Sequence, residues 1–108
     1  MPVVAILRGV TPGAIDDIAE AIISALNSPD PFASIDRMAK RFAGRAIVGA
    51  GTVLSVGDVE RCKQVGAQII VSPNMRADVI AATVASGMLS APGCLTPTEA
   101  FAALDAGA

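Results

Sequence analysis

The chain has 108 residues, which suits one small domain or part of a larger fold. Apolar residues make up 53% of it and charged residues only 17%, so we expect it to belong to a larger unit or to bury faces against other subunits. A net charge of −2 and an aromatic content of three Phe argue against a nucleic-acid-binding surface.

The sequence also argues against a membrane protein and a metal site. No apolar run approaches the roughly 18 residues of a transmembrane helix, because Asp16, Asp17 and Glu20 interrupt the best candidate. There is no His, and Cys62 and Cys94 lack metal-ligand spacing. We therefore expect no metal, no membrane partner and two reduced thiols in the core of a cytoplasmic protein without a signal peptide.

A unit of strand, small-residue turn and helix recurs about every twenty residues. Continuous apolar strands that alternate with helices predict a parallel sheet covered by helices. Equal spacing favours a (β/α)8 barrel, and 108 residues supply about half of one. The expected strands are 46–50, 68–72 and 88–91, and the helices that follow them are 56–65, begun by Ser55 with Asp58, 76–86, and a last one capped by Thr96 with Pro97 and Glu99.

The first part of the chain breaks this period. A strand at 3–7 precedes a helix expected at 12–24, and a second helix is expected at 31–42. Two helices thus separate the first strand from the next one, at 46–50. The simplest interpretation is that a strand of about eight residues is missing between Ala25 and Leu26.

Five blocks of the sequence resemble the bacterial 2-keto-3-deoxy-6-phosphogalactonate aldolases, sisters of the 2-keto-3-deoxy-6-phosphogluconate aldolases. The resemblance covers essentially all 108 residues in order. The blocks are Ala-Ile-Leu-Arg-Gly-Val-Thr-Pro at 5–12, Leu-Asn-Ser-Pro at 26–29, Ile-Val-Gly-Ala-Gly-Thr-Val-Leu at 47–54, Ile-Val-Ser-Pro-Asn at 70–74 and Ala-Pro-Gly-Cys-Leu-Thr-Pro-Thr-Glu-Ala at 91–100.

This resemblance implies that 1–108 is the N-terminal half of a single (β/α)8 barrel domain, in a homotrimer with class I aldolase chemistry and no cofactor. In the family a lysine forms a Schiff base with the substrate ketone, and the protonated imine accepts the electrons released by carbon–carbon cleavage. A glutamate acts as general acid and base. The products are pyruvate and glyceraldehyde 3-phosphate, from a phosphorylated keto-deoxy sugar acid.

The chain departs from the family pattern at both catalytic residues. The family glutamate lies in an Ile-Glu-(Val/Ile)-(Pro/Thr) strand before Leu-Asn-Ser-Pro, and that strand is the one expected to be missing. The family lysine lies on a strand that would follow Ala108. The resemblance therefore implies that no catalytic residue is present here, and Lys40 and Lys63 are interpreted as solvated surface residues, as are Asp58 and Glu60.

The expected substrate-binding residues follow the strands. The side chains of Arg8, Thr52, Pro73 and Pro92 should open on the same end of the sheet and face one shared cavity, because they stand at the C-terminal ends of parallel strands. Arg8 suits the pyruvyl carboxylate, because a guanidinium binds carboxylates bidentately. Thr52 follows two glycines that let a ligand approach. Pro73 and Pro92 end strands, and each has a turn or helix start as its alternative role. Asn27, with Ser28, either binds substrate or caps the helix at 31–42.

Two alternatives to a galactonate enzyme stay open. One is the 2-keto-3-deoxy-6-phosphogluconate or 4-hydroxy-2-oxoglutarate specificity of the sister enzymes. The other is a non-catalytic half-barrel that assembles with copies of itself, because an unclosed sheet leaves two edges that need covering.

Overall fold

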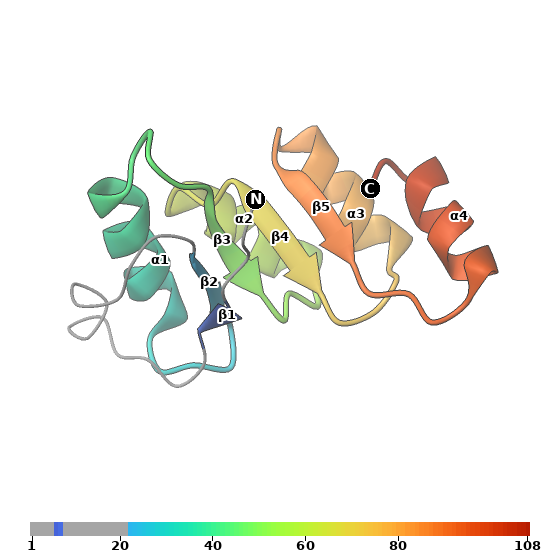
Figure 1. Cartoon of the computed structure of the whole chain (residues 1–108), viewed down its shortest axis with the longest axis horizontal. Helices are drawn as coiled ribbons and strands as arrows, with labels where there is room; N and C mark the ends of the chain where they lie inside the picture. Colours follow the sequence, from blue (N-terminus) through green and yellow to red (C-terminus); the bar gives the residue numbers. More distant parts are fainter. Residues whose placement is uncertain (1–5, 8–21) are drawn as a thin grey trace.

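The computed structural model describes residues 6–7 and 22–108. Their elements alternate between strands and helices after the second strand (Figure 1). None of the described helices is long and apolar enough to cross a membrane. In chain order the elements are β1 (Ile6–Leu7), β2 (Ile22–Ala25), α1 (Pro31–Arg41), β3 (Val48–Gly51), α2 (Val56–Gln64), β4 (Ile69–Ser72), α3 (Ala77–Ala85), β5 (Leu89–Pro92) and α4 (Pro97–Asp105).

The five strands form one parallel sheet in the order β1-β2-β3-β4-β5. Helices α2 and α3 lie behind this sheet in Figure 1, and α4 lies beyond α3 at the β5 end. Neighbouring strands in space are neighbours in sequence, which is the winding of a (β/α) barrel that has not closed. The predicted parallel sheet with helical connections is confirmed.

The core lies between the sheet and the helices. Val48, Ala50 and Ile70 are buried on that side, where they pack with Ile35 and Met38 of α1. Because side chains alternate along a strand, the intervening positions of β3, β4 and β5 face the other side of the sheet. Leu89 on that side is 56% exposed.

The helix starts agree with the sequence signals. Thr96 and Glu99 form a complete capping box, in which the Thr96 hydroxyl accepts from the Glu99 N–H and the Glu99 carboxylate accepts from the Thr96 N–H. Ser55 caps α2 by accepting from the Asp58 N–H at 3.2 Å. Both caps satisfy backbone donors that have no partner in the first helical turn.

The strand expected to be missing between Ala25 and Leu26 is absent as a separate segment, and residues 22–25 form a strand in its place. β2 occupies Ile22–Ala25, so residues 22–24 do not belong to the helix expected at 12–24, and the rest of that expected helix lies outside the described residues. β2 pairs with both β1 and β3, and the Leu26 N–H donates to the Gly51 carbonyl at 2.9 Å. The chain therefore passes from a strand directly into Leu-Asn-Ser-Pro. Hydrogen bonding of β2 to strands on both sides favours the extended conformation more than the helical spacing of Ile22 and Ile23 favours a helix.

β5 is an edge strand of the described sheet, and only some of its residues present a backbone N–H to the open edge. The Leu89 N–H donates to the carbonyl of Gln68, just before β4, at 2.9 Å, and the Gly93 N–H donates to the Ser72 carbonyl of β4 at 2.8 Å. The alternate residues Ser90 and Pro92 therefore turn their backbones to the open edge. Proline has no N–H, which leaves Ser90 as the donor on this edge of the strand.

Candidate functional site

The predicted site residues that the structure describes lie at one edge of the sheet. Asn27 follows β2, Thr52 follows β3, Pro73 follows β4, and Pro92 is the last residue of β5. Because the strands are parallel, these positions share the C-terminal edge, where (β/α) barrels place their chemistry. The expected common edge is confirmed for these four residues. Arg8 lies outside the described residues.

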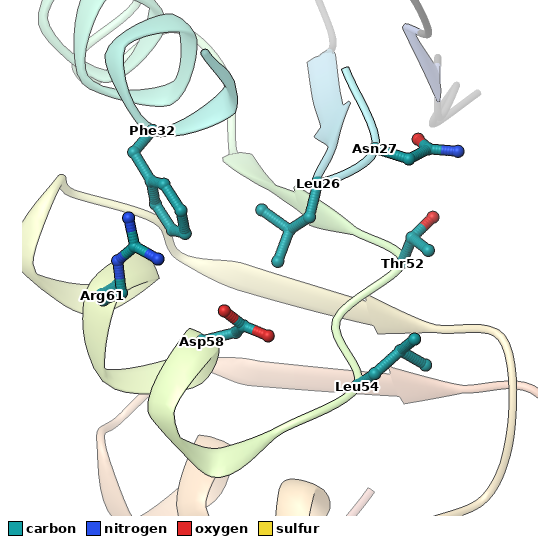
Figure 2. A pocket seen from close by; sticks show the side chains of 7 residues that line it. All are labelled: Leu26, Asn27, Phe32, Thr52, Leu54, Asp58 and Arg61. Atoms are coloured by element: carbon teal, nitrogen blue, oxygen red, sulfur yellow. The ribbon is translucent and has the colours of Figure 1, made fainter. Parts of the chain in front are cut away.

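A cavity of about 340 Å³ opens at this edge, between the N-terminal ends of α1 and α2 (Figure 2). Asn27 and Thr52 line it, whereas Pro73 and Pro92 are not among its lining residues, so this cavity is not the one expected to be shared by Thr52, Pro73 and Pro92. Its volume falls within the range of small-ligand pockets. The lining residues are Leu26, Asn27, Phe32, Thr52, Leu54, Asp58 and Arg61.

Thr52 has an unusual backbone conformation for its residue type. Its φ is 61°, in the left-handed region, which a β-branched side chain rarely adopts. The residue joins β3 to the segment that leads to the cap Ser55, and the next N–H, of Val53, donates to the Val71 carbonyl at 3.4 Å. Local strain of this kind is frequent at ligand sites.

The alternative role of Asn27 and Ser28 as a helix cap is wrong. α1 begins at Pro31 with Asp30 in the N-cap position, and no side chain caps it. Asn27 is exposed and lines the cavity, while Ser28 is buried. The Asn27 side chain is therefore available at the cavity.

The turns after β4 and β5 are packed against each other. The Gly93 N–H donates to the Ser72 carbonyl at 2.8 Å, and a Cβ on Gly93 would collide with the Pro73 carbonyl oxygen. The Pro-Gly turn at 92–93 thus needs glycine for a close backbone approach. This packing fixes the two prolines relative to each other.

A second group of cavity residues comes from the helices. The Arg61 guanidinium of α2 stacks on the Phe32 ring of α1, 3.9 Å from its centroid. Asp58, predicted as an ordinary surface charge, is half-buried and lines the same cavity. Sequence reasoning missed Phe32, Arg61 and Leu54, although the spacing of three residues places Asp58 and Arg61 one turn apart on the same face of α2.

The lysines have the surface environment expected of them. Lys40 pairs with Asp36 at 2.7 Å, and Lys63 is exposed on α2. Within the described residues, no group of His, Cys, Asp and Glu could hold a metal ion. The two cysteines differ: burial raises the pKa of Cys62 to about 12, with Asp58 adding to the effect, whereas Cys94 is exposed. The prediction of two core thiols is thus confirmed only for Cys62.

Comparisons with known proteins agree with this arrangement. The chain is 44% identical over 115 positions to a probable 2-dehydro-3-deoxy-6-phosphogalactonate aldolase of Rhizobium meliloti, covering 99% of this chain and 54% of the relative. It is 43% identical over 116 positions to the 2-dehydro-3-deoxy-6-phosphogalactonate aldolase of Escherichia coli, covering all of this chain and 57% of the relative. Both alignments are longer than 108 residues, so each relative has residues without a counterpart here.

A solved structure described as native KDPGal superposes on the fold with a TM-score of 0.90 at 43% identity. It covers 100% of this chain, which spans 56% of that one. The chain thus spans about half the length of the relatives it matches, which confirms the prediction of a partial barrel. The sequence also matches the family described as KDPG and KHG aldolase over residues 15–108. The parallel sheet, the site at its C-terminal edge and these matches show that the chain belongs to the KDPG and KHG aldolase family.

Proposed function

We propose that residues 1–108 form the N-terminal half of a single barrel domain of a class I aldolase. Its reaction is cleavage of 2-keto-3-deoxy-6-phosphogalactonate to pyruvate and D-glyceraldehyde 3-phosphate. The observation that carries this proposal is the identity of 43–44%, over essentially the whole chain, to two aldolases named for that substrate. The enzyme would be a cytoplasmic homotrimer of galactonate degradation that needs no cofactor.

The residues at the C-terminal edge would bind the pyruvyl part of the substrate. Asn27 and Thr52 lie on the same side of Leu26 in Figure 2, so an amide and a hydroxyl are available to one ligand. In this proposal Arg8 holds the carboxylate, and Pro73 and Pro92 line the neighbouring part of the pocket. The strained φ of Thr52 supports a ligand contact over a purely structural role.

The catalytic glutamate has no counterpart in β2. In the family pattern it stands three residues before Leu-Asn-Ser-Pro, a position occupied here by Ile23. Ile23 pairs in register with Gly49, within the sheet that carries the site. Neither β2 nor the turn after it, as far as Pro29, contains a carboxylate. The chain would therefore depend on another general acid and base, and on a lysine outside these 108 residues.

A chimaera tests the proposal. The 108 residues are fused to the part of the Escherichia coli relative that lies beyond the matched region, and pyruvate release is measured with a coupled lactate dehydrogenase assay. We expect borohydride to trap pyruvate on a lysine of the added part, with slow cleavage. Ile23→Glu should raise the cleavage rate by about 10²-fold or more, in the range of general acid–base catalysis. A folded chimaera that neither traps pyruvate nor responds to Ile23→Glu would disprove the assignment.

The same assay decides between substrates. The chain is 38% identical, over only 61 residues, to a 2-dehydro-3-deoxy-phosphogluconate aldolase of Treponema pallidum. This shorter and weaker match favours the galactonate substrate over the gluconate substrate. We expect a higher kcat/KM for 2-keto-3-deoxy-6-phosphogalactonate than for the gluconate epimer or 4-hydroxy-2-oxoglutarate. A preference for either alternative would move the assignment to the sister activity.

A self-assembling half-barrel remains a second candidate, supported by the open side of β5 and α4. Large apolar side chains there are exposed, among them Leu95 at 98% and Phe101 at 70%. Multi-angle light scattering of the purified chain tests this candidate. A defined oligomer that Phe101→Glu converts to monomer would support self-assembly through this surface, whereas a monomer would rule it out.

A further inference from the structure

Arg61 is an exposed cation that lines the cavity and makes no ion pair with the other described residues. Its stacking on Phe32 at 3.9 Å is its recorded side-chain contact, and it makes no hydrogen bond or ion pair within the part of the chain that the structure describes. Stacking on an aromatic face leaves the edge of a guanidinium, with its N–H donors, free to bind. The Phe32 ring also restricts the Arg61 side chain before any ligand arrives.

The neighbours of Arg61 restrict the ligand class. Asp58 stands one turn before Arg61, and the Ser55 hydroxyl donates to its Oδ2 at 2.8 Å, so a carboxylate with remaining acceptor capacity lies beside the guanidinium. Asp58 repels any anion, but it repels a phosphate of nearly two negative charges more than a singly charged carboxylate, and it offers an acceptor to ligand hydroxyls. Leu26 and Phe32 offer apolar surface to a carbon chain.

We propose that Phe32, Asp58 and Arg61 form a binding site for a small polyhydroxy carboxylate, a sugar acid without a phosphate group. The Arg61 guanidinium takes the carboxylate, and Asp58 accepts from the hydroxyls. Figure 2 shows these three side chains on one side of Leu26 and Asn27 with Thr52 on the other. The three side chains line a different part of the same cavity from Asn27 and Thr52, so a ligand bound by them would not need the pyruvyl contacts proposed above, and the proposal goes beyond that function.

The test is calorimetric titration of the whole chain with D-galactonate, compared with galactitol, which has the hydroxyls without the carboxylate, and with inorganic phosphate. We expect D-galactonate to bind more tightly than either. Arg61→Gln should weaken its binding about tenfold or more, since charge-assisted hydrogen bonds are lost. Lys63→Gln is the matched control, because it removes the same charge from the same helix outside the cavity.

Amide chemical-shift mapping gives a second readout. D-galactonate should shift the amides of Leu26, Phe32 and Asp58 in the parent chain and leave them unmoved in Arg61→Gln, with circular dichroism confirming that the variant is folded. The proposal is wrong if D-galactonate causes no shifts, if Lys63→Gln weakens binding as much as Arg61→Gln, or if galactitol or phosphate binds as well. The pyruvate-trapping assay does not depend on Arg61, so failure here leaves the aldolase proposal standing.

Discussion

The carbonyl oxygen and the side chain of Ile69 occupy the space in which a Cβ on Gly49 would stand. β3 and β4 are paired at this position, so relief would require a shift of the β4 backbone. We expect Gly49→Ala to lower the free energy of unfolding by about 3 kcal/mol, as for other overpacked core substitutions. Urea denaturation followed by circular dichroism measures this change.

Gly57→Ala is the control for that substitution. Gly57 lies in the first turn of α2, and a Cβ there would meet only the Ser55 hydroxyl, at 4.0 Å. Alanine should raise the free energy of unfolding by about 0.5–1 kcal/mol through its higher helix propensity. Equal losses at Gly49 and Gly57 would show that β3 and β4 are not packed as described.

The capping box of α4 gives a second prediction. Thr96→Ala removes the acceptor for the Glu99 N–H and should cost about 1 kcal/mol of unfolding free energy. Thr96→Ser keeps the hydroxyl and should retain most of the stability. Thermal denaturation of the two variants in parallel checks the difference. If serine and alanine destabilise equally, the Thr96 hydroxyl does not cap the helix.

Low pH should destabilise the N-terminal end of α4, because it protonates the Glu99 carboxylate of the capping box. The backbone N–H groups of Leu95 and Thr96, together with the Thr96 hydroxyl, hold the pKa of Glu99 below its ordinary value. A depressed native pKa means that the stabilisation is complete above the pKa of the unfolded chain, about 4.3, and is lost as the pH falls through the native pKa. Glu99→Gln should reduce the loss of stability between pH 5 and 3, the range to measure by urea titration. An unchanged profile would contradict this role.

The two cysteines should differ in reactivity. Burial raises the pKa of Cys62 to about 12, so almost no thiolate exists at pH 8, whereas Cys94 is exposed. We expect Ellman's reagent to label one thiol quickly in the native chain and the second only in denaturant. Cys94→Ser should abolish the fast reaction. Fast labelling of that variant would mean that Cys62 is accessible.

Neither lysine should form an imine with pyruvate. Lys40 is paired with Asp36 and Lys63 is exposed on α2, so neither has the desolvated environment that activates a lysine amine as a nucleophile. After incubation with pyruvate and borohydride, mass spectrometry of the 108-residue chain should find both residues unmodified. A stoichiometric pyruvyl adduct on either lysine would reveal a nucleophile that the structure does not suggest.

The sequence predicted the second part of the fold closely because its local signals agree with the tertiary pairing. The helices expected at 31–42, 56–65 and 76–86 are found at Pro31–Arg41, Val56–Gln64 and Ala77–Ala85. The first part failed at β2. There two adjacent isoleucines fit both a helical face and a strand, and only the pairing with β1 and β3, distant in sequence, decides between them.

The candidate site was predicted to a similar extent. Strand ends identify Asn27 and Thr52, because parallel topology places them at one edge. Sequence spacing could not predict the contact between Phe32 and Arg61, because this contact depends on how the neighbouring helices α1 and α2 pack against each other. Asp58 was misjudged for the same reason: its spacing predicts a cap, and its position beside a cavity depends on the neighbouring α1.

The alternation of Ser90 and Pro92 along β5 also bears on aggregation. An added strand could receive one N–H from the Ser90 backbone and none from Pro92, so a second sheet could add there only with a shortened hydrogen-bond ladder. Cross-β stacking needs every backbone group of the strand to find a partner above and below. Pro92 thus protects this edge of β5 against pairing with a foreign sheet, as prolines on edge strands do.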